Sequence, residues 1–373
     1  MLAEETTANP LPRGHDPRAQ VDAPAVRVST GARTDLKPLT SLRFLAAFLV
    51  FVSHTNPVLE RDLLGHAGVG FFFVLSGFIL TYTYQHAFVG RFDLSKMRSF
   101  WVARVARIYP VHLVTLAIAV WLIVSPGLNV WKILVNALLL QSWFPNHYTY
   151  YGLNSVSWSI SDEAFFYVLF PFVAWLIFRP RLSSTHLLLV AAVLCGTVIA
   201  GIAAFAIASD EWLLYIFPPT RFIDFLAGML LGAAFVRRTM PTRPNARHAT
   251  LLEVGLLVAI PLAIVWSPHL PPSIRYTAWL IPFWGALVYV FAHQAGAISA
   301  LLSHRLMIYL GEISFSFYMI HQLVIRTWTS TAGSAFTVAG LAFSIATSIA
   351  LAIVLYELVE NPMRRRIRAA LSR

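Results

Sequence analysis

Residues 39–57 read LTSLRFLAAFLVFVSHTNP, an apolar stretch that holds two titratable side chains. A spanning helix needs roughly 20 mostly apolar residues, because the hydrocarbon core of a bilayer is about 30 Å thick. Arg43 and His54 stand eleven residues apart in this stretch. At about 100° and 1.5 Å per residue they lie on one helix face, roughly 16 Å apart along the axis. Because such groups are costly in a membrane and usually functional, the stretch predicts both a spanning helix and a site.

The composition indicates that lipid surrounds most of the chain. Of 373 residues, 58% are hydrophobic and 12% are charged, whereas soluble domains carry about 25% charged residues. The single cysteine, Cys195, excludes a disulfide framework and a cysteine-based metal cluster, and we expect no metal cofactor. The net charge of +11 comes from basic residues between the apolar runs. That pattern indicates orientation in a membrane, and we expect no nucleic-acid partner.

Apolar runs of spanning length follow one another along the chain, and they predict an all-α membrane protein with about ten transmembrane helices. A shorter apolar piece, 131–143, has Trp at both ends and predicts a re-entrant or interfacial helix in the loop after the third span. The ten expected spans cover residues 38–56, 66–86, 106–124, 163–179, 186–208, 219–236, 249–267, 274–293, 306–326 and 333–358.

The distribution of basic residues predicts the orientation of the chain. Most of the 28 Lys and Arg residues fall in alternate connecting segments, which by the positive-inside rule places both termini in the cytoplasm. Residues 1–37 are polar, lack the apolar core of a signal peptide, and are expected to form a disordered cytoplasmic tail. We expect 38–366 to form the membrane domain and 367–373 a short basic cytoplasmic tail.

His54 is a candidate general base. Imidazole is the side chain best suited to take a proton near neutral pH, and a hydroxyl becomes a good nucleophile only when a base removes its proton. Glu163 opens the fourth span at about the same depth. An acidic group there complements the helix dipole, and it can also hold an imidazole as a triad carboxylate does. His321, in the ninth span, competes with His54 for the role of base.

Two pairs of charged residues stand at helical spacing. Arg104 and Arg107 lie three residues apart before the third span, on one helix face. Guanidinium groups pair well with phosphate, so the two are a candidate clamp for an anionic substrate, and ordinary topological charge is the alternative. Arg221 and Asp224 have the spacing of an intrahelical ion pair, which we expect to be structural.

Taken in order, the motifs resemble those of the acyltransferase 3 family of integral-membrane O-acyltransferases. The resemblance extends from Thr40 to Arg366. The matching stretches are LRFLAAFLVFVSH at 42–54, VGFFFVLSGFIL at 69–80, RVAR at 104–107, WSISDEAFFY at 158–167, RFIDFLAGMLLG at 221–232, LGEISFSFYMIH at 310–321 and LVENPMRR at 358–365.

The resemblance implies a ten-helix domain in a bacterial inner membrane. It implies transfer of an acyl group, usually acetyl from acetyl-CoA bound from the cytoplasm, to a hydroxyl of a sugar, a glycan, a lipid-linked sugar or a small molecule such as a macrolide. Catalytic roles are implied for Arg43, His54 and Glu163, and donor binding for Arg104 and Arg107. The further candidates that the motifs carry are Ser76, Trp158, Tyr167, Arg221, Asp224, Tyr318 and His321.

A proton-coupled transporter or flippase is the alternative of another class, because it also needs buried Arg, His and Glu. It does not by itself explain the basic pair before the third span. The aromatic residues of 143–152 either stack on sugar rings or form an interfacial belt, and the belt is favoured. The residues leave open the acceptor, the acyl chain length and the choice between direct transfer and an acyl-enzyme.

Overall fold

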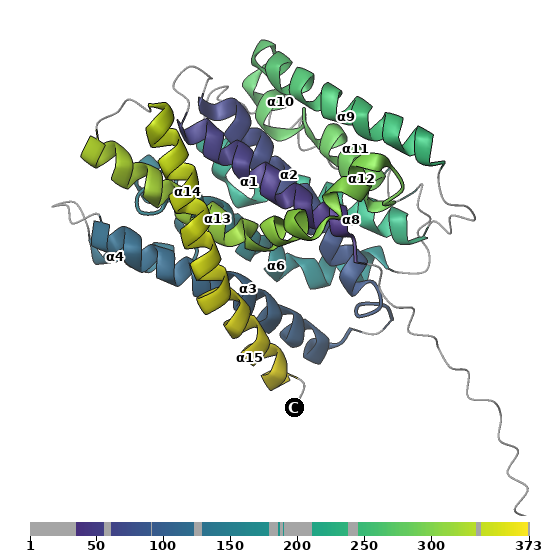
Figure 1. Ribbon diagram of the computed structural model, residues 1–373. Coiled ribbons are helices and arrows are strands. Elements are labelled where there is room, and N and C mark those ends of the chain that lie inside the picture. The colour runs from purple at the N-terminus through teal and green to yellow at the C-terminus, as the bar shows by residue number, and fades with distance from the viewer. Residues whose placement is uncertain are drawn as a thin grey trace, which may run out of the picture. The chain divides into compact units, whose positions relative to one another are not determined.

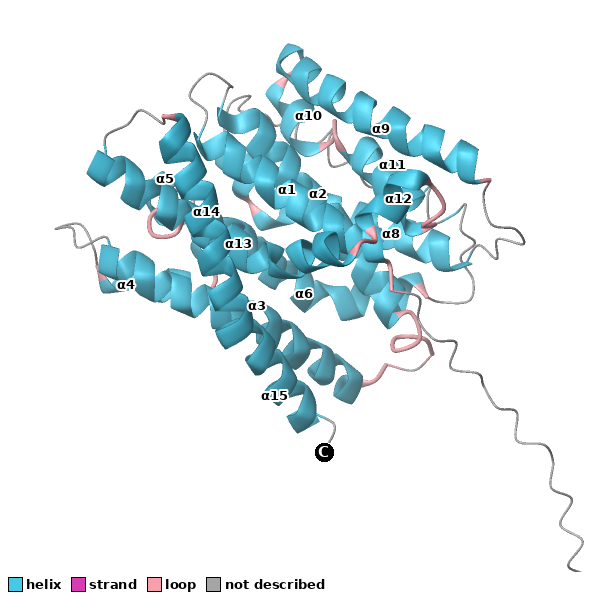
Figure 2. Ribbon diagram, viewed as in Figure 1, coloured by secondary structure: helices cyan, strands magenta, loops and turns pink. Residues whose placement is uncertain are grey.

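A computed structural model describes residues 35–55, 61–90, 92–122, 129–178, 186, 189, 211–237, 245–332 and 337–371. Within these ranges the chain forms helices and short loops and contains no strand (Figure 2). Nine segments of this part are long and apolar enough to cross a membrane, which confirms the expected all-α membrane protein. The expected fifth span, 186–208, lies outside the described residues apart from positions 186 and 189.

The first half of the chain contains α1 (Lys37–Thr55), α2 (Arg61–Tyr84), α3 (Leu94–Leu122), α4 (Val130–Ala137), η1 (Gln141–Trp143), α5 (His147–Tyr150), η2 (Ser155–Ser157) and α6 (Trp158–Ile177). Of these, α1, α2 and α6 begin and end within five residues of the expected spans. Helix α3 differs, because it begins at Leu94 and not at the expected residue 106, so Arg104 and Arg107 lie inside this helix and not before it. The short helix expected at 131–143 is present as α4, and it ends earlier than expected, at Ala137.

The second half contains η3 (Trp212–Ile216), α8 (Pro218–Arg237), α9 (Ala246–Trp266), η4 (Ser267–His269), α10 (Pro272–Thr277), α11 (Ile281–Ala292), α12 (Ala297–Leu302), α13 (Arg305–Ala332), α14 (Val338–Leu355), η5 (Tyr356–Glu360) and α15 (Asn361–Leu371). The expected span 274–293 is divided between α10 and α11, and Pro282 lies in the first turn of α11, where its missing N–H is tolerated. Residues 367–371, expected in a tail, continue helix α15.

Helix α1 packs against α2 and α13 (Figure 1). Aromatic rings join α1 to α13, with the ring centroids of Phe44 and Phe51 at 5.3 and 5.9 Å from that of Phe317.

Helices α2 and α8 cross at very short range. A Cβ atom on Gly77 would meet the carbonyl oxygen of Phe225, and one on Gly228 would meet the carbonyl oxygen of Val74. Small residues permit this approach in membrane proteins because backbones can then pack directly. The crossing fixes the face of α2 that turns toward the site.

Helix α15 packs against α3 after the chain passes through the π-helical turn η5 (Figure 1). Helix α3 also packs against α6 and α13. Residues near the two ends of the described chain are thereby brought to one place, where the charged side chains of α1, α3, α6 and α15 meet.

Candidate active site

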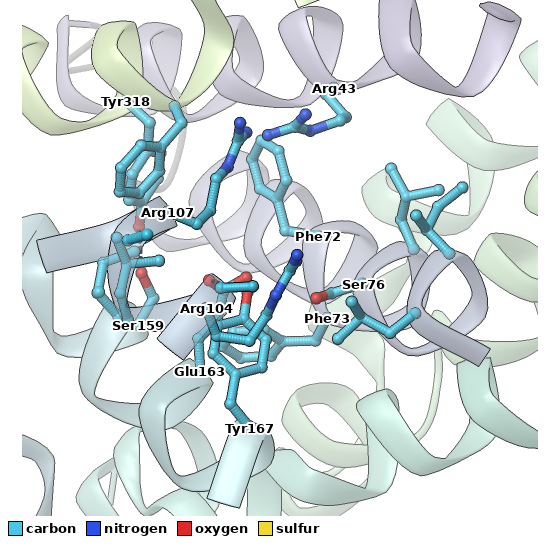
Figure 3. Close-up of a pocket in the computed structure, with 18 of the residues that line it drawn as sticks. Arg43, Phe72, Phe73, Ser76, Arg104, Arg107, Ser159, Glu163, Tyr167 and Tyr318 are labelled. Atoms are coloured by element: carbon cyan, nitrogen blue, oxygen red, sulfur yellow. Dashed lines mark hydrogen bonds between the residues drawn. The ribbon is translucent and has the colours of Figure 1, made fainter. Parts of the chain in front are cut away.

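A cavity of about 290 Å³ lies among α1, α2, α3, α6, α13 and α15. We call it the arginine cavity, because Arg43, Arg104, Arg107 and Arg364 line it. Glu163 lines it as well, and Figure 3 shows its carboxylate and the guanidinium groups of Arg43, Arg104 and Arg107 gathered around one space. The four guanidinium groups make this cavity suitable for an anionic ligand.

The guanidinium group of Arg104 is held by aromatic side chains. It lies 5.7–6.0 Å from the ring centroids of Tyr84, Phe100 and Tyr167, and its Nη2 donates to the Tyr84 hydroxyl at 3.4 Å. Arg104 has no ion-pair partner among the described residues. Its charge is therefore available to a ligand. The Tyr167 hydroxyl, in turn, donates to Glu163 Oε2 at 3.0 Å.

Arg107 is in a different electrostatic position, because it forms an ion pair with Glu360. Its Nη1 lies 2.7 Å from Glu360 Oε1, and the Glu360 side chain is 0% exposed. Arg364 Nη1 is 3.6 Å from the same oxygen, and Ser316 Oγ donates to the other carboxylate oxygen at 2.9 Å. The structure therefore brings the expected pair Arg104 and Arg107 to one cavity and gives the two guanidinium groups unequal freedom to bind phosphate.

A second cavity, of about 630 Å³, is lined by His54, His66 and His147, and we call it the histidine cavity. Its other polar and aromatic lining residues are Ser53, Thr55, Tyr151, Ser155, Trp158, Glu211, Tyr215, Tyr318, Gln322, Arg326 and Thr329. The Tyr151 hydroxyl donates to Glu211 Oε1 at 3.0 Å, and both burial and this carboxylate raise the pKa of Tyr151. Aromatic faces and hydrogen-bonding groups together suit a hydroxylated ligand.

His54 is solvent-accessible in this cavity, and it faces His321. The Nδ1 atom of His54 lies 2.8 Å from the carbonyl oxygen of Val50 and 3.4 Å from Nε2 of His321. His321 itself is fully buried on α13. The two rings have centroids 5.4 Å apart.

The expected contact between Glu163 and His54 is wrong. Glu163 lines the arginine cavity and bonds to Tyr167, one turn further along α6, whereas His54 lines the histidine cavity and faces His321. The expectation matched the two residues by depth in the membrane, but contact also depends on the side of the helix from which each side chain projects. The face of α6 that carries Glu163 turns toward the arginines.

Tyr318 lies where the two cavities adjoin, because it lines both of them, as does Val69. The Tyr318 hydroxyl donates to the Val156 carbonyl at 3.2 Å and lies 2.9 Å from Ser159 Oγ. Arg43 and His54 therefore project from one helix into adjoining cavities.

The remaining candidates divide between the cavities and the core. Ser76 and Tyr167 line the arginine cavity, and Trp158 lines the histidine cavity. Arg221 Nη2 lies 2.9 Å from Asp224 Oδ2, with both side chains at most 4% exposed, which confirms the expected buried ion pair. Neither residue of this pair lines either cavity.

Glu360 and Arg364 are not among the residues that the sequence predicts for the site. Their spacing, Glu followed four residues later by Arg, was the available signal, since it favours an intrahelical pair.

Two residues of the aromatic loop 143–152, His147 and Tyr151, line the histidine cavity. Trp143 of the same loop packs edge-on against Phe165, with ring centroids 5.1 Å apart.

Comparison with known proteins shows the family of the chain. The profile of the acyltransferase 3 family, described as "Acyltransferase domain", matches residues 38–357. The chain belongs to this family. It is 30% identical to the acyltransferase MdmB of Streptomyces mycarofaciens, over 88% of this chain and 92% of MdmB.

Two further relatives are each 25% identical to the chain. One is the peptidoglycan O-acetyltransferase OatA of Listeria monocytogenes, matched over 81% of this chain and 51% of OatA. The other is the exopolysaccharide production protein ExoZ of Rhizobium meliloti, matched over 82% of this chain and 92% of ExoZ. The chain thus spans about half the length of OatA. No solved structure matches it. Family and relatives together show an O-acyltransferase, and the helices show a multi-pass membrane protein.

Proposed function

We propose that this acyltransferase moves an acyl group, acetyl in the simplest case, from acyl-CoA to a hydroxyl of a sugar, a glycan or a glycolipid. The observation that carries the proposal is that a basic cavity and a cavity holding an accessible imidazole adjoin at Tyr318. Such an arrangement suits an anionic donor on one side and a hydroxyl acceptor on the other.

The donor would bind with its phosphates at Arg104, whose charge has no ion-pair partner among the described residues. Arg43 and Arg364 add positive charge to the same lining. Guanidinium groups form charge-assisted hydrogen bonds to phosphate, which are about twice as strong as neutral ones. The extended pantetheine arm would then run along α1 toward Tyr318, which brings the thioester to the edge of the histidine cavity.

The transfer itself would use His54 as general base. The acceptor hydroxyl gives its proton to the imidazole of His54, and its oxygen attacks the thioester carbonyl carbon. The carbon–sulfur bond breaks, and the departing CoA thiolate takes the proton from His54. Such a base typically contributes about 10²–10⁴ in rate. An acyl-histidine intermediate is the alternative route, and ping-pong kinetics distinguish it from direct transfer.

We also propose that the protein resides in a bacterial inner membrane with both termini in the cytoplasm. Arg104, Arg107 and Arg364 all fall in segments that the distribution of basic residues places on the cytoplasmic side. These three side chains line one cavity. CoA, a cytoplasmic metabolite, would then reach the arginine cavity directly.

A secondary metabolite such as a macrolide is a second candidate acceptor. The volume of the histidine cavity, about 630 Å³, falls within the range of roughly 300–1,000 Å³ found for small-molecule sites. A small molecule would occupy this cavity whole, whereas a glycan would place only its terminal residues there.

The test uses purified protein in detergent with radiolabelled acetyl-CoA and, in parallel, a glycan and a macrolide acceptor. Label transferred to an acceptor hydroxyl supports the proposal, and it cannot result from transport because detergent solution has no closed compartments. His54→Ala should abolish transfer, while His269→Ala, at an exposed position in η4, should leave it unchanged. Folded His54→Ala protein with near-normal activity contradicts the assignment of the base.

A further inference from the structure

We propose that His321 is the positioning residue of the transfer reaction. It fixes the tautomer of His54 and accepts a hydrogen bond from the His54 imidazolium that forms when the acceptor hydroxyl loses its proton. This inference rests on the proposed role of His54 as base, and it gives His321 the part that a carboxylate plays in a Ser-His-Asp triad.

The tautomer of His321 follows from its hydrogen bonds. Its Nδ1 atom lies 2.7 Å from the carbonyl oxygen of Tyr318 and 3.3 Å from that of Phe317. A carbonyl oxygen can only accept, so Nδ1 carries the proton and donates it. A neutral imidazole has one N–H, and the other ring nitrogen, Nε2, therefore presents a lone pair. That nitrogen faces His54.

The surroundings of His321 favour this neutral ring. The side chain is 0% exposed, and the ring stacks on Phe317 at a centroid distance of 5.9 Å and an interplanar angle of 17°. The ring centroid of Phe51 lies 6.0 Å from that of His321. Among the described residues the hydrogen bonds of His321 go to two carbonyl oxygens and to His54, and none goes to a carboxylate. A buried charge without a counter-charge is strongly unfavourable.

The tautomer of His54 follows in the same way. Its Nδ1 atom lies 2.8 Å from the carbonyl oxygen of Val50, so this nitrogen carries a proton. The Nδ1–H group is shared between that carbonyl and the lone pair of His321 Nε2 at 3.4 Å. Nε2 of His54 is consequently the basic nitrogen, and the side chain that bears it lines the histidine cavity.

The reaction makes the contact between the two imidazoles stronger. When Nε2 of His54 takes the hydroxyl proton, the ring becomes an imidazolium and its Nδ1–H becomes a better donor. His321 accepts from it without taking the proton. Which nitrogen of a catalytic histidine is basic is set in general by the hydrogen bond that the other nitrogen makes.

The experiment compares His321→Gln with His321→Asn. The amide of Gln reaches the position of Nε2 and retains an acceptor facing His54, whereas the amide of Asn reaches only the position of Nδ1. We expect His321→Asn to lower kcat by about ten- to hundredfold, because the loss of a hydrogen bond to a charged group has about this effect on a rate. His321→Gln should keep most of the wild-type kcat. The KM for acetyl-CoA should stay within about twofold in both variants, because the donor binds in the other cavity.

His112→Asn is the matched control for loss of a buried imidazole. His112 is 1% exposed, its Nε2 lies 2.8 Å from the carbonyl oxygen of Asn136, and it lines neither cavity. A purely structural role for His321 predicts that its Gln and Asn variants lose kcat in proportion to their loss of thermal stability, as His112→Asn does. Equal kcat values for His321→Gln and His321→Asn overturn the proposal.

A double-variant cycle separates this inference from the proposed function. Because His321 acts through His54, His321→Asn should not lower the residual rate of His54→Ala any further. Additive losses overturn the role of His321 even where His54 is confirmed as the base. An active His54→Ala protein, by contrast, overturns the proposed function itself. If His321→Asn is thermally unstable, the cycle is measured with His321→Ala at a temperature where all proteins are folded, with the same criterion.

Discussion

The ion pair between Arg107 and Glu360 allows a test of how the arginine cavity is held together. Arg107→Ala removes the guanidinium group that lies 2.7 Å from Glu360 Oε1, and it leaves a carboxylate whose side chain is 0% exposed. Arg364 remains, but its Nη1 is 3.6 Å from that oxygen and its side chain is 28% exposed. Solvent therefore screens Arg364 more strongly than Arg107.

The size of the effect follows from these distances. Coulomb attraction falls as 1/r, so Arg107 attracts this oxygen about 1.3 times as strongly as Arg364 before screening. Removing one partner of a buried ion pair typically costs about 3–5 kcal/mol, because the other charge is left uncompensated. Since Arg364 compensates part of that charge, we expect Arg107→Ala to lower the free energy of unfolding by about 3 kcal/mol. Arg364→Ala, the matched control, should lower it by about 1 kcal/mol or less.

The assay is thermal unfolding in detergent, followed by tryptophan fluorescence. Besides the two single variants it includes Arg107→Ala/Glu360→Gln. This double variant should unfold at a higher temperature than Arg107→Ala alone, because no buried charge remains and the glutamine can still accept from Ser316. Equal unfolding temperatures for Arg107→Ala and Arg364→Ala would refute the reasoning, and so would a double variant no more stable than Arg107→Ala.

Two further predictions concern donor binding and helix packing. Arg104→Ala should raise the KM for acetyl-CoA about tenfold or more in steady-state assays, because it removes one charge-assisted hydrogen bond to the donor. The thermal stability should change little. An unchanged KM contradicts the role of Arg104 in donor binding. Gly77→Ala should destabilise the protein by about 1–3 kcal/mol in detergent melts, because the added methyl group meets the Phe225 carbonyl oxygen. Gly255→Ala is the control, because a Cβ atom at this position meets nothing within 4 Å. Equal stability of the Gly77→Ala and Gly255→Ala variants would argue against a tight crossing of α2 and α8.

The spanning helices could be predicted well because hydropathy and length are local properties of the sequence. Helix α1 was expected at 38–56 and spans Lys37–Thr55, and α8 was expected at 219–236 and spans Pro218–Arg237. The division of 274–293 into two helices could not be predicted from hydropathy. The break itself, Ala278–Leu280, is apolar, so a loss of hydropathy does not mark it.

The members of the site could be predicted better than their partners. Arg43, His54, Arg104 and Arg107 each line one of the two cavities, as titratable residues next to apolar runs often do. Which side chain faces which is decided by the rotation of each helix and by its neighbours. That is why Glu163 was paired with the wrong partner. The pairing of Arg107 with Glu360 joins residues that are far apart in the chain, and it exists only because α15 packs against α3.

The placement of Arg43 and His54 on a single helix has a consequence for the choice of donor. A continuous α-helix cannot shorten or stretch, so the spacing of roughly 16 Å between their Cα positions is constant. In the proposed complex the donor passes Arg43 before its activated carbonyl reaches His54, so a useful donor must carry that carbonyl at least this far from its phosphates. CoA thioesters meet this requirement through their long pantetheine arm. Acetyl phosphate, whose carbonyl adjoins its phosphate, does not, so the geometry of one helix discriminates between two activated forms of the same acyl group.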